Sequence, residues 1–332
     1  MVETASREQT DPIIDLRGLT KRYGEHLAVN QLDLSVFRGE IFGLLGPNGA
    51  GKTTTILMML GLTEPSGGTA RVCGLNPVRD PLLIKRKVGY MPDDVGFYED
   101  RSGLDNLLFT ARLNRLPERL ARERAAELLE KVGLSDVANK KAGTYSRGMR
   151  QRLGLADVLI KQPEVIILDE PTLGIDPEGV RELLQLISDL SRLGGLTVLL
   201  SSHHLHQVQQ ICDRVGLFVQ GELIASGDIE TLSRELDQEG ILTLEMEVSG
   251  WDEKLAASIR AMEGIGEVQV REAGQPFGIH TVTIRSSQQT ITPDIVQLLV
   301  QSGAQLHQLR QQQYGLDDIY HRFFQGGGQR HV

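Results

Sequence analysis

The chain has 332 residues, of which 40% are hydrophobic and 24% charged, and its 35 Lys and Arg against 44 Asp and Glu give a formal net charge of −9. This length and apolar content predict two or three compact units and exclude a small disulfide-rich scaffold and a wholly disordered chain. The acidic balance disfavours a protein that wraps nucleic acid, so no nucleic-acid partner is expected.

The beginning of the chain gives no sign of export or membrane insertion. Residues 1–11 are polar, are expected to form a flexible tail and lack the apolar core of a signal peptide. No stretch approaches the about 18 consecutive apolar residues of a membrane span. Cys73 and Cys212 stand in no metal-binding spacing, which is typical of reduced core thiols. The sequence therefore predicts a cytoplasmic chain, and any role at a membrane requires a partner.

The N-terminal part of the chain alternates short apolar runs with glycine and proline. Apolar runs of this length predict buried strands, and the run that follows the first Gly-rich loop is compatible with a helix. The predicted elements are strands at Ile13–Leu16, Leu32–Val36 and Glu40–Leu45, a helix over Thr53–Leu60, a turn at Glu64–Gly68 and a strand at Val88–Met91.

The middle of the chain is predicted to be mainly helical, from about Gly96 to Leu159. Pro117 is expected to start one helix, whose buried face carries Ala121, Ala125, Leu128 and Val132. Strands return at Val165–Leu168 and Leu196–Leu200, on either side of a helix near Glu178–Ser191. Strands that alternate with helices in this way predict a parallel sheet covered by helices.

The C-terminal section begins with a shift in composition near Asp228–Gly240. Its predicted order is β-α-β-β-α-β, which is the ferredoxin-like order. A last helix is expected to carry Leu316, Ile319, Tyr320 and Phe323 on one stripe. The predicted elements before it are an alternating strand at Leu242–Val248, a helix at Glu253–Met262, strands near Val268–Val270 and Thr281–Ile284, a helix from Thr292 to about Gly303, and a weak strand.

A phosphate-binding loop is predicted between the strand at Glu40–Leu45 and the helix at Thr53–Leu60. The residues fit G-x-x-x-x-G-K-[ST], in which glycines let backbone N–H groups surround phosphate oxygens at a helix N-terminus. Lys52 is expected to reach the β- and γ-phosphates, and the Thr53 hydroxyl to reach Mg²⁺. The alternative is a Gly-rich turn with a surface lysine, which the preceding apolar strand disfavours. The predicted nucleotide contacts are Gly46, Pro47, Asn48, Gly49, Ala50, Gly51, Lys52, Thr53 and Thr54.

Two acids follow the buried strand at Val165–Leu168. Ligands of open α/β sheets lie at the carboxyl ends of the strands, so Asp169 is predicted to hold Mg²⁺ there. Glu170 is predicted to orient and deprotonate an attacking water. The alternative is a pair of solvated acids, which is disfavoured beside a phosphate loop.

The segment Tyr145-Ser146-Arg147-Gly148-Met149-Arg150-Gln151-Arg152, between the phosphate loop and these acids, resembles the L-S-G-G-Q signature of ABC-type ATPases. With the other motifs, residues Ile13–Leu232 resemble the ATP-binding subunit of a bacterial exporter-type ABC transporter that carries an extra C-terminal domain. The resemblance implies a P-loop NTPase core at 12–235, with N-terminal antiparallel strands and a helical subdomain at about 96–160. A small α+β, ferredoxin-like domain would occupy 240–332.

The resemblance also implies roles for residues outside the loop. Ser146 and Gly148 match residues that contact the γ-phosphate bound to the opposite subunit, although Arg147 and Met149 depart from the usual signature. An ordinary capped helix without such a ligand is the alternative. Tyr23 matches the aromatic residue on which adenine stacks, with a plain hairpin tyrosine as the alternative.

Three further positions follow from the same resemblance. His203, rather than His204, matches the histidine that contacts the γ-phosphate and water; a structural histidine is the alternative. Asp176 matches the loop that crosses the dimer interface and can also cap the following helix. Asp93 stands where the family has a glutamine, and as a carboxylate it still offers oxygen to Mg²⁺ or water.

The implied function is ATP hydrolysis, with ATP and Mg²⁺, in a head-to-tail pair with a second ATP-binding subunit. The pair would drive a polytopic membrane permease from the inner face of the cell membrane. The alternatives are a non-transport ABC ATPase that acts on another macromolecule, and a module that binds ATP without hydrolysing it. The C-terminal domain is predicted to be regulatory or dimer-stabilising, with ligand sensing as the alternative.

Overall fold

The computed structural model describes residues 11–229, 231–232, 242–272, 279–288 and 290–312. The chain forms two compact units, Met1–Ile229 and Glu230–Val332. The predicted limits at residues 235 and 240 fall outside the described residues, as does the predicted tail except for Asp11. None of the described helices combines the length and the apolar character needed to cross a bilayer.

A three-stranded antiparallel sheet contains the N-terminal strands in the order β2-β1-β4. One of its faces is buried, because apolar residues recur along β1 and β2. The turn predicted at Glu64–Gly68 is partly wrong, since Gly67 and Gly68 begin β4. Gly68 has a φ of +76°, and a Cβ atom there would lie 2.2 Å from the Gly18 carbonyl oxygen, so glycine allows the strand to pass β1 this closely. The strands are β1 (Ile14–Tyr23), β2 (His26–Val36) and β4 (Gly67–Val72).

The central sheet has six strands in the order β5-β6-β7-β3-β8-β9. Strands β5, β6, β7, β3 and β8 run parallel to one another, which confirms the predicted parallel sheet, and β9 pairs antiparallel with β8. Its middle strands are buried on both faces, as expected for their continuous apolar sequences. The strands are β5 (Val88–Met91), β6 (Val165–Asp169), β7 (Thr197–Ser202), β3 (Ile41–Leu45), β8 (Arg214–Val219) and β9 (Glu222–Gly227).

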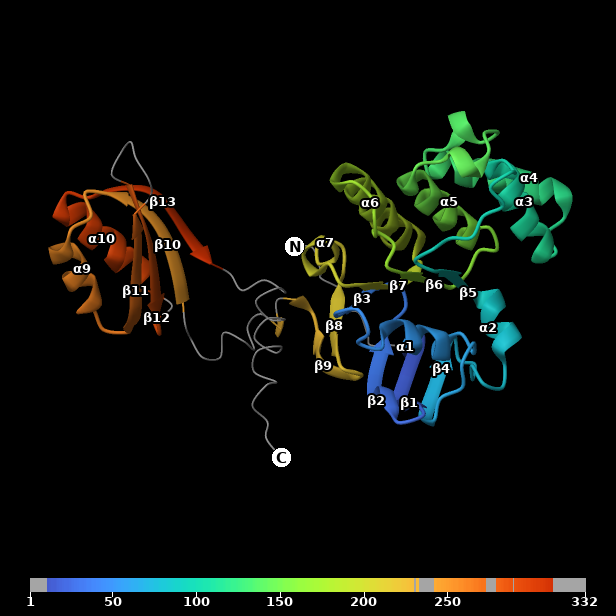
Figure 1. Cartoon of the computed structure of the whole chain (residues 1–332), viewed down its shortest axis with the longest axis horizontal. Helices are drawn as coiled ribbons and strands as arrows, with labels where there is room; N and C mark the ends of the chain where they lie inside the picture. The colour runs from blue at the N-terminus through green and yellow to red at the C-terminus, as the bar shows by residue number, and fades with distance from the viewer. Residues whose placement is uncertain (1–10, 230, 233–241, 273–278, 289, 313–332) are drawn as a thin grey trace, which may run out of the picture. The chain divides into compact units, whose positions relative to one another are not determined.

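Helices cover both faces of the central sheet. Helix α1 lies between this sheet and the three-stranded sheet, and α5 and α6 lie on the opposite face (Figure 1). One continuous apolar core joins α1 to both sheets, with Phe42 of β3 and Phe218 of β8 fully buried in it. The helices outside the helical segment described next are α1 (Lys52–Met59), α2 (Pro81–Lys87), α6 (Pro177–Gly194) and α7 (Leu205–Val208).

The segment between Gly103 and Leu159 is helical apart from its connections, as predicted. It has its own apolar core, to which Ala121, Ala125 and Val132 contribute from the predicted face of α4. The Tyr145 hydroxyl donates a hydrogen bond of 2.7 Å to the Val137 carbonyl and holds the segment before α5 against this core. The elements are α3 (Gly103–Leu113), α4 (Glu118–Lys131), η1 (Ser135–Val137), η2 (Ala142–Thr144) and α5 (Arg147–Leu159).

The second unit is a four-stranded antiparallel sheet in the order β11-β12-β10-β13, which confirms the ferredoxin-like prediction. Leu244, Met246 and Val248 of β10 are fully buried, so the alternation in the sequence correctly marks the core face. The predicted final helix at Leu316–Phe323 lies outside the described residues. The elements are β10 (Leu242–Ser249), α9 (Glu253–Arg260), β11 (Ile265–Glu272), β12 (Ile279–Ser286), α10 (Thr292–Ser302) and β13 (Gln305–Gln312).

The Gly-rich loop between β3 and α1 is held against neighbouring backbone. A Cβ atom on Gly46 would lie 2.1 Å from the Phe218 carbonyl oxygen, and one on Gly51 would lie 2.3 Å from the Ala28 carbonyl oxygen. The Gly221 N–H donates to the Ala50 carbonyl at 2.8 Å. Strand β2 and the β8–β9 hairpin therefore fix the loop, and they can approach it only where it lacks side chains.

Two glycine substitutions in this loop distinguish the effect of close packing on stability from the effect of backbone strain. Gly51→Ala should destabilise the chain by about 3 kcal/mol or more, because it adds a backbone clash to a positive φ of 105°. Gly49→Ala is the matched control: its φ is +79° but its Cβ would meet open space, so the loss should be about 1–2 kcal/mol. Urea unfolding of the full chain measures both, and equal midpoints would contradict the account.

Candidate nucleotide site

A pocket of about 610 Å³ lies at the carboxyl ends of β3, β6 and β7. Most of the predicted site residues line it together, although they come from segments far apart in the sequence. Gly46 is absent from the lining because it backs onto Phe218. The lining residues are Tyr23, His26, Ala28, Pro47, Asn48, Gly49, Ala50, Gly51, Lys52, Thr53, Thr54, Tyr90, Asp93, Asp169, Glu170, Leu173 and His203.

Lys52, the first residue of α1, holds its ammonium group inside the loop. Its Nζ donates to the carbonyl oxygens of Gly46 at 2.7 Å and Pro47 at 3.1 Å. It also lies 3.3 Å from Glu170 Oε1. The side chain is 5% exposed, so the positive charge is balanced mainly by these oxygens rather than by water. An anionic group that enters the pocket would find this ammonium already in position.

The hydroxyl of Thr53 and the carboxylate of Asp169 are hydrogen-bonded to each other in the pocket. Thr53 Oγ1 donates to Asp169 Oδ2 at 2.9 Å, and Ser201 Oγ on β7 donates to Asp169 Oδ1. Strand β6 places Asp169 opposite Ser201 in the parallel ladder, which explains the second bond. The result is a pair of hard oxygen donors, hydroxyl and carboxylate, beside the loop, and Mg²⁺ prefers such ligands.

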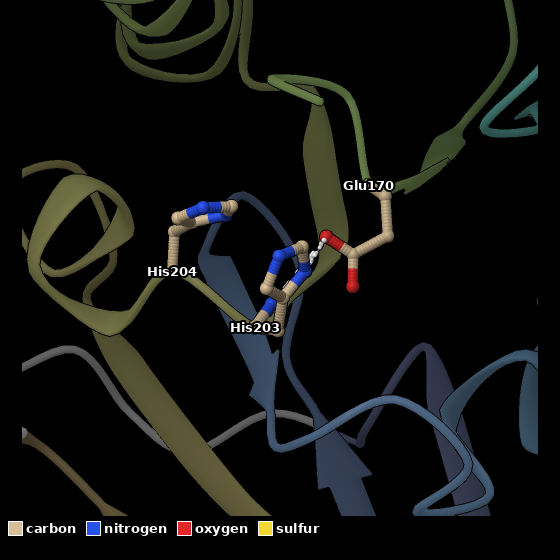
Figure 2. A group of neighbouring side chains, drawn as sticks. All are labelled: Glu170, His203 and His204. Atoms are coloured by element: carbon tan, nitrogen blue, oxygen red, sulfur yellow. Dashed lines mark hydrogen bonds and ion pairs between the residues drawn. The ribbon is translucent and has the colours of Figure 1, made fainter. Parts of the chain in front are cut away.

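Glu170 leaves β6 in a left-handed conformation, with a φ of +49°. Its N–H donates to the carbonyl oxygen of Ser201 at 3.1 Å and to the hydroxyl of Ser201 at 3.2 Å. Oε2 contacts Nδ1 of His203 at 2.8 Å, as Figure 2 shows, and also accepts from the His203 N–H at 3.4 Å. The carboxylate therefore lies between the Lys52 ammonium and the His203 imidazole.

The two adjacent histidines have different surroundings. His203 lines the pocket, whereas His204 is exposed and lies outside the lining residues. The ring centroids are 3.9 Å apart. Burial, and then the neighbouring His203, lower the pKa of His204, with a smaller opposing effect of Glu170. His203, the histidine chosen from the family resemblance, is thus the one that lines the pocket, and its contact with the γ-phosphate stays a prediction.

The tyrosines of the pocket differ in exposure. Tyr23 is 47% exposed, and the Lys21 ammonium lies 4.8 Å from its ring centroid. About half of the side chain is therefore accessible to a planar group, beside a cation that lies over the ring. Tyr90 is half-buried, and desolvation together with Asp169 and Asp93 raises its pKa to about 12, so its hydroxyl is neutral. Tyr90 lies on β5, three residues before Asp93, and no side-chain role was predicted for it.

Asp93 lines the pocket, but its hydrogen bonds are made to residues outside the phosphate loop. Its Oδ1 accepts from the Asp94 N–H at 2.9 Å. Its carbonyl oxygen accepts from Arg147 at 3.2 Å and from the Gln151 side-chain amide at 3.3 Å. The backbone of this segment is therefore tied to α5, while the carboxylate remains beside the pocket.

Ser146, Gly148 and Asp176 do not line the pocket. Ser146 Oγ caps α5 by accepting from the Met149 N–H at 3.2 Å. Asp176 Oδ2 caps α6 by accepting from the Gly179 N–H at 3.3 Å, which confirms the capping alternative for this residue. Gly148 packs near Ile175, where a Cβ atom would lie 3.4 Å from Ile175 Cγ2. Within one chain, these residues are separate from the phosphate loop.

Arg147 and Ser201 hold the pocket in place through hydrogen bonds that were not predicted from the sequence. Arg147 donates from Nε to the Leu173 carbonyl at 2.7 Å and from Nη2 to the Asp93 carbonyl, so it joins α5 to two loops of the pocket. The only sign of this role in the sequence is that Arg147 stands where the usual signature has a different residue. Ser201 gave no signal, because its bonds to Asp169 and Glu170 depend on how β6 and β7 pair.

The arrangement has the chemistry needed for phosphate transfer to water. An ammonium and a helix N-terminus attract phosphate oxygens, and a hydroxyl–carboxylate pair suits Mg²⁺. A carboxylate held by an imidazole can accept a proton from water.

Comparison with known proteins agrees with this chemistry. Residues 29–173 match the ABC transporter family model. The chain is 37% identical over 260 residues to the linearmycin resistance ATP-binding protein LnrL of Bacillus subtilis, covering 78% of this chain and 83% of LnrL. It is 35% identical over 317 residues to the bacitracin transport ATP-binding protein BcrA of Enterococcus faecalis, covering 95% of this chain and 97% of BcrA.

A solved structure shares the fold of the first unit. The dimeric ATP-binding cassette MJ0796, in a post-hydrolysis state bound to ADP and Pi, matches with a TM-score of 0.59 at 25% identity, covering 65% of this chain and 98% of that chain. Together with the motifs and the pocket, these matches show that the chain belongs to the ABC transporter family, as an ATP-binding and ATP-hydrolysing subunit.

Proposed function

We propose that the chain powers an exporter by hydrolysing ATP between two copies of its first unit. The observation that carries this proposal is the common pocket of Lys52, Thr53, Asp169, Glu170 and His203. The names of two relatives, which refer to bacitracin transport and linearmycin resistance, support an export role. The cargo would be bound by the membrane partner, so its contacts lie outside this chain.

The triphosphate would bind along the Gly-rich loop. Lys52 Nζ would exchange the Gly46 and Pro47 carbonyls for β- and γ-phosphate oxygens, supported by the N–H groups at the start of α1. Residues Pro47 to Thr54, which line the pocket, would surround the phosphates, and adenine would stack on the exposed part of the Tyr23 ring.

Mg²⁺ would be held by Thr53 and Asp169, whose donor oxygens lie 2.9 Å apart. Asp93 would add an oxygen from the edge of the pocket. The bound ion would neutralise phosphate charge as it develops. The fit rests on hard oxygen donors that are already together, and Ser201 keeps Asp169 turned toward Thr53.

Glu170 would accept a proton from water as the water oxygen attacks the γ-phosphorus. The bond from the γ-phosphorus to the β–γ bridging oxygen breaks, and ADP leaves with the electron pair. His203 would orient Glu170 through its 2.8 Å contact and stabilise the γ-phosphate oxygens. Lys52 would balance the charge that builds up on those oxygens.

A second copy would complete each site. Ser146 and Gly148 at the start of α5, and Asp176 at the start of α6, would approach the nucleotide bound to the opposite chain in a head-to-tail pair. Their position outside their own chain's pocket supports this arrangement. ATP would close the pair and hydrolysis would open it, moving a polytopic permease from the cytoplasmic face of the membrane.

Replacing the loop lysine tests nucleotide binding. Lys52→Ala should weaken ATP binding by at least about tenfold and lower ATP turnover by about 10²–10³-fold, because it removes the buried ammonium. Fluorescent-nucleotide titration and phosphate release measure the two effects. Arg38→Ala, which removes a surface cation paired with Glu164, is the control. Unchanged affinity and turnover in Lys52→Ala would refute the phosphate-loop assignment.

Replacing the proposed base tests the hydrolysis step. Glu170→Gln should lower turnover by about 10²–10⁴-fold while ATP still binds, since the amide cannot accept the proton. ATP should then hold the chains as a dimer, which light scattering after size exclusion detects. Wild-type turnover together with a monomer in ATP would show that Glu170 is not the base.

We infer that the second unit stabilises or regulates the pair. It has its own buried core, and its described residues lack the phosphate-site constellation of the first unit. Truncation after Leu232 should therefore weaken dimerisation by about tenfold or more and leave the ATP affinity of the first unit intact. Sedimentation with and without ATP measures the dimer constant, and an unchanged constant would count against this role.

A further inference from the structure

Three nitrogen and oxygen ligands converge at the ends of β6 and β7. Glu170, His203 and His204 each offer one ligand atom, and these atoms all lie within 4.8 Å of one another. Figure 2 shows the His203 ring between the Glu170 carboxylate and the His204 ring. The pairing of Asp169 with Ser201 places the two chain segments side by side just after their strands end.

The donor set differs from the oxygen pair of Thr53 and Asp169. Two imidazoles and one carboxylate form a common three-ligand set for Zn²⁺, with a further position open to water. Mg²⁺ prefers oxygen ligands in octahedral geometry and is a poor match for two imidazoles. The cluster therefore suits a borderline transition-metal ion rather than the ion expected beside the phosphates.

Small side-chain rotations would bring the cluster to a metal-binding geometry. Ligand atoms around a tetrahedral Zn²⁺ are about 3.4 Å apart, given bonds of about 2.1 Å. His203 Nδ1 and Glu170 Oε2 are closer, at 2.8 Å, and the widest separation in the cluster is below 4.8 Å. His204 is exposed and can turn without disturbing the core, and it gives the ion a route from solvent.

We propose that Glu170, His203 and His204 form a binding site for Zn²⁺ whose occupancy stops ATP turnover. The inhibitory part rests on the proposed function, because Zn²⁺ would occupy Oε2 of the proposed base and Nδ1 of the histidine that orients it. The Lys52 ammonium contacts the other oxygen of Glu170, so ATP could still bind while hydrolysis is blocked.

Zinc binding by the full-length chain without nucleotide tests the site directly. Competition with a chromophoric chelator should show that His204→Ala loses one Zn²⁺ site, or binds at that site at least about tenfold more weakly. Absorption spectra of Co²⁺ give a second measure of ligand number. His204→Gln should lose the same zinc affinity, which shows that the effect does not depend on the choice of alanine. His307→Ala is the control, because it removes a histidine of the second unit.

Turnover at buffered free Zn²⁺ tests the inhibition. The wild type and His307→Ala should be inhibited equally, whereas His204→Ala should keep its basal rate and need at least tenfold more free Zn²⁺. Equal zinc affinity in the wild type and both His204 variants overturns the site. Zinc bound through His204 without slower turnover overturns the inhibitory role. Failure of the proposed function would be distinct, because turnover would then be missing, or insensitive to Glu170→Gln, in the absence of zinc.

Discussion

The carboxylate of Asp169 connects three parts of the chain that are distant in sequence. One oxygen accepts from Thr53 at the start of α1 at 2.9 Å, and the other accepts from Ser201 at the end of β7. Because Asp169 is 3% exposed, these bonds replace water around a charged group. Hydrogen bonds to charged groups contribute about 1.5–3 kcal/mol each. This one side chain thus aligns the loop, β6 and β7, and the pocket depends on that alignment.

The pairing of β6 with β7 also fixes the position of Glu170, the residue that follows Asp169. A non-glycine residue in the left-handed region costs about 1–3 kcal/mol, and the two hydrogen bonds from its N–H to Ser201 offset part of that cost. The turn carries the carboxylate into the space between Lys52 and His203. The strained residue is the one that we propose as the base, and its contact with His203 brings two of the proposed zinc ligands together.

Much of the fold follows from patterns that the sequence displays. Apolar runs with β-branched residues correctly predicted β3, β5, β6 and β7, and alternation predicted β10 and its buried face. The elements that were missed include β4, α2, α7, β8 and β9, although β8 carries an apolar run, Val215–Val219, much like that of β3. Strand β4 begins with two glycines, which alone indicate a turn; it is a strand because Gly68 can pass within contact distance of Gly18. Local sequence propensity cannot predict a contact between residues that are this far apart in the chain.

The sequence by itself determined the phosphate loop, the acids after β6 and the likeness to ABC ATPases, because these depend on residue types at short spacing. It also determined that Asp176 can cap a helix. Only the tertiary structure decided that Ser201 bonds Asp169, that Arg147 joins α5 to two loops, and that Glu170 lies within reach of both His203 and His204. Those contacts join strands and loops separated by many residues, and the pairing of parallel strands, rather than any local pattern, sets their distances.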